Sequence, residues 1–136
     1  MVRSAFAELL GRHLNVPGEL SSIATTYRND GLYPETHEAL LARGIPEATL
    51  RSFRPTHMED ARELFVPGSL FLCMTQAHRQ ALADRGPAPA KSDFFLALLG
   101  TNEEIPDPVL DGADFETTFR VLERGVRALK RELELA

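Results

Sequence analysis

The chain contains few of the residues that build covalent or metal-linked frameworks. It has a single cysteine, Cys73, among 136 residues. One cysteine cannot form a disulfide within the chain, and it excludes the Cys-x-x-Cys pairs of redox and zinc sites. The histidines are scattered without the spacing of metal ligands, and we interpret them as surface or helix-capping residues: His13, His37, His57 and His78. We therefore predict no metal, no cofactor and a reducing compartment.

Excess positive charge and long apolar segments are also missing. The formal net charge is −5, so the chain has no broad positive field for nucleic-acid phosphates or anionic membranes. No stretch approaches the roughly 18 apolar residues of a spanning helix, and the N-terminus lacks the charged-then-apolar pattern of a secretion signal. We predict a cytoplasmic protein that binds neither nucleic acid nor membrane.

The residues that are present predict one folded α/β domain over positions 1–136. The length suits a single domain, and 43% of the residues are hydrophobic. The apolar pattern alternates between helical and strand-like spacing several times, which is typical of a small, mainly parallel sheet flanked by helices in three layers. We expect a strand at Leu20–Thr26, a strand buried on both faces at Ser69–Met74 and a last strand at Phe94–Leu99.

Helices are predicted between these strands. Ser4 is expected to cap the first helix, Thr75 the fourth and Asp114 the last, and Thr56 with Glu59 has the spacing of a capping box. The five helices are expected at 4–14, 34–44, 56–65, 75–85 and from Phe115 to about Leu133, and Gly86-Pro87-Ala88-Pro89 as a loop. A doubly wound fold usually has a strand before its first helix, so we expect a strand in front of Met1.

Arg3 and Ser4 stand where the first helix begins. Free amides and the helix dipole favour an anion there, and the planar arginine guanidinium has the geometry to donate hydrogen bonds to phosphate oxygens. The alternative is an ordinary helix cap with a solvated neighbour.

Asp107 lies between Pro106 and Pro108, near the end of the chain. The two prolines restrict the backbone around Asp107, so its carboxyl group would be held stiffly and could act as a general acid. The alternative is a turn aspartate without chemistry.

Together with several other segments, these two features resemble the low-molecular-weight protein-tyrosine phosphatase family. That family opens with a strand, a Cys-x-x-x-x-x-Arg-Ser loop and a helix, and the chain matches the end of this loop and the elements behind it. The matching segments are Met1-Val2-Arg3-Ser4, Ala7-Glu8, Ser21–Thr25, His37–Ile45, Leu70–Met74 and Asp107-Pro108.

The resemblance implies a set of site residues. Val2, Arg3 and Ser4 would hold the phosphoryl group, with Arg3 neutralising its charge. Asp107 would protonate the leaving oxygen, and Tyr27 and Tyr33 would flank the substrate. The expected partner is a phosphorylated protein or a small phosphomonoester.

The resemblance also places the nucleophilic cysteine and the first, central strand before Met1. Cys73 lies inside an apolar strand pattern, so it is not a substitute. We therefore predict no phosphatase activity for this chain as given, and the alternative is a non-catalytic phosphate- or phosphotyrosine-binding module. If the central strand is absent, the natural protein is longer, the neighbouring strands close up, or a second copy pairs with the exposed edge as a homodimer.

Overall fold

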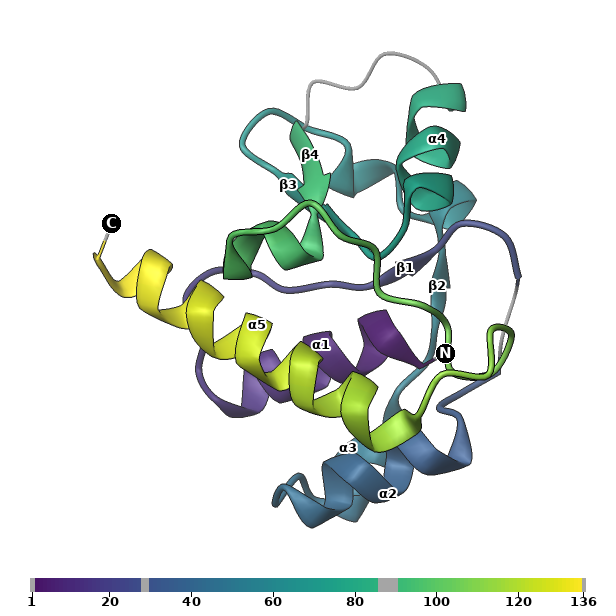
Figure 1. Ribbon diagram of the computed structural model, residues 1–136, viewed down its shortest axis with the longest axis vertical. Helices are drawn as coiled ribbons and strands as arrows, with labels where there is room; N and C mark the ends of the chain where they lie inside the picture. The colour runs from purple at the N-terminus through teal and green to yellow at the C-terminus, as the bar shows by residue number, and fades with distance from the viewer. Residues whose placement is uncertain (1, 28–29, 86–90, 136) are drawn as a thin grey trace.

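The computed structural model describes residues 2–27, 30–85 and 91–135 and consists of helices around short parallel strands (Figure 1). The helices are α1 (Arg3–His13), α2 (Pro34–Ala42), α3 (Glu47–Ser52), α4 (Gln76–Asp84) and α5 (Phe115–Leu135). The strands are β1 (Ile23–Ala24), β2 (Thr56–His57), β3 (Leu70–Cys73) and β4 (Lys91–Phe94). Three 3₁₀ turns complete the described part: η1 (Met58–Asp60), η2 (Arg62–Leu64) and η3 (Phe95–Leu99).

The strands form two parallel pairs. β1 pairs with β2, with Ile23 opposite Thr56, and β3 pairs with β4, with Cys73 opposite Phe94. Each pair is a separate two-stranded sheet. The predicted α/β class, with parallel strands flanked by helices, is confirmed, and the strands form two small sheets where one was expected.

The core lies largely under α1 and α5, which run side by side on one side of the strands (Figure 1). Phe6 of α1 and Phe119 of α5 are buried, and their rings stack with centroids 4.7 Å apart. Leu122 and Val126 continue the buried face of α5. The predicted apolar stripe of the last helix therefore forms a real packing surface, and burying each of these side chains stabilises the fold by about 1.5–3 kcal/mol.

The helix starts were predicted with mixed success. The carboxylate of Asp114 accepts the Thr117 N–H at 2.9 Å, and the hydroxyl of Thr75 accepts the His78 N–H at 3.2 Å, so both predicted caps are confirmed. Ser4 is not a cap, because α1 already begins at Arg3 and Val2 occupies the N-cap position.

The predicted helix over 56–65 is wrong. Thr56 pairs with Ile23 in a strand, and two 3₁₀ turns follow. The ring of His57, rather than the Thr56 hydroxyl, accepts the Glu59 N–H at 3.2 Å. The capping-box spacing therefore did not start an α-helix. The short helix α3 was not predicted.

The predicted strands differ from the observed ones in length and place. The segment Leu20–Thr26 pairs only over Ile23–Ala24. The apolar run Phe94–Leu99 is mostly the turn η3, which buries Phe95 against α5, and the strand precedes it. β3 lies within Ser69–Met74 but is not buried on both faces, since Leu70 is 54% exposed. The predicted loop Gly86–Pro89 lies outside the described residues.

Candidate functional site

Arg3 is the first residue of α1, so its side chain stands where the helix presents its free amides. Val2 precedes it with φ −116° and ψ −78°, and the Val2 carbonyl accepts the Phe6 N–H at 3.1 Å. The Val2 side chain makes no capping hydrogen bond, and no acidic residue lies in the first turn of α1. Ser4 is half-buried in that turn. The helix dipole therefore favours an anion at this end.

Arg3 is held by the loop that contains Asp107, although the two residues lie near opposite ends of the sequence. The Arg3 guanidinium donates to the Ile105 carbonyl at 2.5 Å, and its Nη2 lies 3.6 Å from Oδ2 of Asp107. The side chains of Arg3 and Asp107 are 11% and 22% exposed. Burial lowers the pKa of Arg3, and the charges of Asp107, Asp111 and Glu104 oppose that effect. The structure thus brings together the two residues expected to carry the chemistry.

Asp107 makes the hydrogen bonds of a turn aspartate, and it also approaches Arg3. Its Oδ1 accepts the Val109 N–H at 2.8 Å and the Leu110 N–H at 3.4 Å, as a turn aspartate does. The Asp107 N–H donates to Oδ2 of Asp111 at 2.9 Å, and the Asp111 N–H donates to the Asp107 carbonyl at 2.8 Å. These bonds fix the loop so that the second carboxylate oxygen faces Arg3.

The start of α4 is joined to the same loop. The Gln76 N–H donates to the Glu104 carboxylate, and the Ile105 N–H donates to the Met74 carbonyl at 2.8 Å. His78 lies half-buried in the first turn of α4. Burial lowers the pKa of His78, Arg3 lowers it further, and Asp107 and Glu104 oppose both effects.

Sequence reasoning missed three of these residues: His78, Glu104 and Asp111. A usable signal was present, because His78 follows β3, and Glu104 and Asp111 follow the segment of β4 and η3. The carboxyl ends of parallel strands meet at one edge of a sheet, so side chains after these two strands converge.

The two tyrosines expected to flank the substrate have different surroundings. Tyr33 occupies the N-cap position of α2, and its ring stacks on Phe115 at 5.8 Å. Phe115 in turn contacts Phe119, which stacks on Phe6 of α1. Tyr27 follows the bend at 25–26 and is 63% exposed. Ring contacts therefore link Tyr33 to α1, and both tyrosines are exposed at the surface.

Cys73 is buried in β3, as its apolar sequence context suggested. Burial raises the pKa of the Cys73 thiol to about 11, with a smaller opposing effect from Arg79. The side chain is therefore a protonated thiol near neutral pH, and a thiol is a poor nucleophile.

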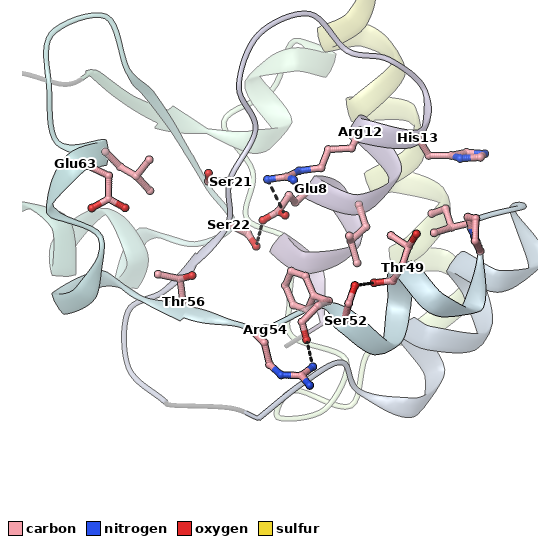
Figure 2. A pocket seen from close by; sticks show the side chains of 15 residues that line it. Glu8, Arg12, His13, Ser21, Ser22, Thr49, Ser52, Arg54, Thr56 and Glu63 are labelled. Atoms are coloured by element: carbon pink, nitrogen blue, oxygen red, sulfur yellow. Dashed lines mark hydrogen bonds and ion pairs between the residues drawn. The ribbon is translucent and has the colours of Figure 1, made fainter.

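A separate cleft of about 530 Å³ opens beside the middle and end of α1 (Figure 2). Its most buried charge is the Glu8 carboxylate, which accepts the Ser22 hydroxyl at 2.8 Å and lies 3.3 Å from the Arg12 guanidinium. The Arg54 guanidinium, at its rim, donates to backbone carbonyls at 2.7 and 2.9 Å. Neither Arg3 nor Asp107 lines this cleft. Glu8, Arg12 and Arg54 thus bind other side chains or the backbone, and these contacts do not point to a particular ligand.

Within residues 2–27, 30–85 and 91–135, no three His, Cys, Asp or Glu side chains are grouped to hold a metal ion. No helix in the same ranges has both the length and the apolar composition for crossing a bilayer.

The arrangement of elements is the fold of the low-molecular-weight protein-tyrosine phosphatases, as the sequence resemblance predicted. One solved structure with this arrangement is the YwlE arginine phosphatase from Geobacillus stearothermophilus, with 24% identity, a TM-score of 0.74, and coverage of 98% of this chain and 86% of that chain. Another is YfkJ from Bacillus subtilis, with 17% identity, a TM-score of 0.74, and coverage of 98% and 88%. No protein-family model and no curated protein matches the sequence. At these identities the comparison shows a shared fold.

Proposed function

We propose that this chain is a phosphatase-type domain whose site holds the phosphoryl group of a phosphorylated protein or a small phosphomonoester. The observation that carries the proposal is the 3.6 Å approach of Arg3 to Asp107 at the start of α1. It places a cation, a helix N-terminus and a carboxyl group together, and these are the protein groups that phosphoryl transfer needs for charge stabilisation and acid catalysis.

Each residue has a defined role in this proposal. The amides at the start of α1, with Val2 and Ser4, bind the phosphoryl oxygens, and Arg3 neutralises their charge. When a nucleophile is supplied, Asp107 in its protonated form donates its proton to the leaving oxygen. The Asp107 carboxylate is the counterion of Arg3 in the free protein, so a phosphoryl group must displace or share it.

The chain as given has no nucleophile for this site. Its single cysteine, Cys73, is a buried thiol with a pKa of about 11. Charge stabilisation and positioning alone do not form a covalent phosphoenzyme. We therefore propose that the 136 residues bind a phosphoryl group without hydrolysing it, and that turnover needs the cysteine that the family carries ahead of its Arg-Ser pair.

A second candidate function is a phosphate- or phosphotyrosine-binding module that does not hydrolyse its ligand. It is favoured by Arg3 itself, whose side chain is only 11% exposed beside a helix start without an acidic residue in its first turn. A buried arginine keeps its charge and gains from an additional anion. Both candidates predict binding, and they differ in whether the domain hydrolyses its ligand when the family's cysteine is supplied.

The first experiment measures phosphate and vanadate binding by calorimetry and hydrolysis of para-nitrophenyl phosphate. Arg3→Ala is the test variant, and Arg12→Ala is the matched control because Arg12 lies on the same helix and lines the separate cleft. We expect binding that Arg3→Ala abolishes and Arg12→Ala retains, without hydrolysis. Hydrolysis that persists in Cys73→Ser would overturn the proposed lack of turnover, and wild-type binding unchanged by Arg3→Ala would overturn the site.

The second experiment separates the two candidates and addresses the substrate. The chain is extended at its N-terminus by a strand and a cysteine-containing loop of the family pattern, and phosphotyrosine and phosphoarginine peptides are compared. Phosphoarginine is included because one structure of the same fold is named an arginine phosphatase. Hydrolysis by the extended chain that Asp107→Asn reduces supports the phosphatase, whereas binding without hydrolysis supports the module.

A further inference from the structure

Asp111 is joined to Asp107 by two hydrogen bonds that run in opposite directions. The Asp107 N–H donates to Oδ2 of Asp111 at 2.9 Å, and the Asp111 N–H donates to the Asp107 carbonyl at 2.8 Å. The chain leaves this turn through Gly112, whose φ of +69° lies in the left-handed region that favours glycine. The two bonds therefore close residues 107–111 into a ring, and one of them depends on the Asp111 side chain.

The carboxyl group of Asp107 is divided between this ring and Arg3. Its Oδ1 accepts the Val109 N–H at 2.8 Å and the Leu110 N–H at 3.4 Å, whereas its Oδ2 lies 3.6 Å from Nη2 of Arg3. Because the Asp107 N–H and one carboxylate oxygen are both bonded within the ring, the side chain cannot turn away from Arg3 without breaking hydrogen bonds. The ring thus holds the carboxylate in the orientation that pairs with Arg3.

The ion pair between Asp107 and Arg3 is partly buried, with side chains 22% and 11% exposed. An anion that binds Arg3 in the proposed site meets a carboxylate of like charge at the same guanidinium, and like charges at this distance repel each other. Asp107 is therefore an internal competitor of the anion. How easily Asp107 is displaced depends on how firmly the ring holds it.

We propose that Asp111 is a positioning residue that weakens anion binding at Arg3 by holding Asp107 against the guanidinium. The inference rests on the proposed function and adds a means of regulating the same site. When the Asp111 side chain no longer accepts the Asp107 N–H, the ring opens, Asp107 turns toward solvent more readily, and Arg3 becomes available to the anion. The charge of Asp111 also acts on Arg3 directly, so the test separates the hydrogen bond from the charge.

Calorimetric titration with sulfate compares two substitutions of Asp111, which is exposed and should tolerate both. Asp111→Ala removes the acceptor oxygen and the charge, whereas Asp111→Asn removes the charge and keeps an acceptor oxygen. We expect Asp111→Ala to bind sulfate about fivefold more tightly than wild type, the size of one partly exposed ion pair, and Asp111→Asn to stay within about twofold of wild type. Glu103→Ala is the matched control and should bind as wild type, because Glu103 is an exposed acidic residue of the same loop.

The same substitution in an Asp107→Asn background shows whether Asp111 acts through Asp107. Asp107→Asn alone should tighten sulfate binding, because it removes the competing charge, and Asp111→Ala should then add nothing. An effect of Asp111→Ala that persists in this background, or that Asp111→Asn reproduces in full, would show that Asp111 acts through its charge and would overturn the positioning role. Equal affinities of wild type and Asp111→Ala would also overturn that role and would leave the anion site intact.

The orientation of Asp107 gives a second readout in the protein without ligand. Three-bond NMR couplings should report one χ1 rotamer of Asp107 in wild type and Asp111→Asn, and averaging between rotamers in Asp111→Ala. A single rotamer retained in Asp111→Ala would overturn the inference independently of any anion. Absence of sulfate binding in wild type and in Asp107→Asn would overturn the proposed function, and this inference with it.

Discussion

Gly125 of α5 offers the sharpest test of how the fold is packed. A Cβ atom at this position would lie 2.2 Å from Cε1 and 2.6 Å from Cζ of the Phe95 ring. Phe95 belongs to η3 and is only 3% exposed, so the ring cannot swing into solvent. Gly125→Ala therefore forces either the ring or the helix to move.

The expected cost follows from two opposing effects. Overpacking a well-filled core typically lowers the free energy of unfolding by about 1–3 kcal/mol. For a clash this close with a rigid ring, we expect a loss of about 3 kcal/mol. Replacing glycine by alanine inside a helix raises the free energy of unfolding by about 1 kcal/mol, because alanine favours the helical backbone. The net loss is about 2 kcal/mol, which for a domain of this size lowers the melting temperature by about 8 °C. Circular dichroism during heating and urea denaturation measure the loss.

Gly11→Ala is the matched control on α1. Its Cβ would lie 2.7 Å from Cδ1 of Leu20, which is the end of a flexible, half-buried side chain, and the next atoms are at 3.7 and 3.8 Å. Leu20 can move, so this variant should stay within about 1 kcal/mol of wild type. Adding Phe95→Leu to Gly125→Ala should recover part of the loss in a double-mutant cycle. An unchanged melting temperature for Gly125→Ala would refute the packing of η3 on α5.

Three further predictions concern other elements. The Cys73 thiol, with a pKa of about 11 instead of 9.0, should react with iodoacetamide near pH 8 about 100-fold more slowly than in urea, and equal rates would contradict its burial. Arg43 donates to Glu123 at 2.8 Å and holds the pKa of that carboxyl below 4.5, so this stabilisation is present above that pH and is lost as the pH falls through the lower folded-state value. Glu123→Gln should therefore lower the free energy of unfolding by up to about 1 kcal/mol at about pH 7 and by little at about pH 3 in urea titrations, and equal losses would show that the charge is not involved. Thr75→Ala should remove the cap of α4 and lower the free energy of unfolding by about 1 kcal/mol in the same assay. Thr75→Ser keeps the capping hydroxyl and should leave the free energy of unfolding near the wild-type value.

Local features of the sequence predicted the helices better than the strands. The apolar spacing of α5 and its Asp114 cap are set by residues close together in the chain, and both were found. Strand length depends on a partner that lies elsewhere, and β1 pairs over only two residues. The run from Phe95 to Leu99 contains apolar residues that suit a strand, but contact with α5 places it in a 3₁₀ turn.

The candidate site shows the same division. Arg3 and Asp107 were selected from their own sequence contexts and from the family resemblance, and the structure places them in contact. His78 and Glu104 belong to no motif, and the signal for them is their position after β3 and after the segment of β4 and η3. They join the site because α4 and the loop before Asp107 meet at the ends of β3 and β4.

The sequence by itself determined the α/β class and the amphipathic face of the last helix, because periodicity and caps are properties of neighbouring residues. It selected Arg3 and Asp107 together as candidates only through the family resemblance. Only the tertiary structure decided where strands pair, why Phe95 needs a glycine opposite it, and which charges surround Arg3. Those outcomes depend on contacts between distant segments, whose distances and burial exist only once the chain has folded.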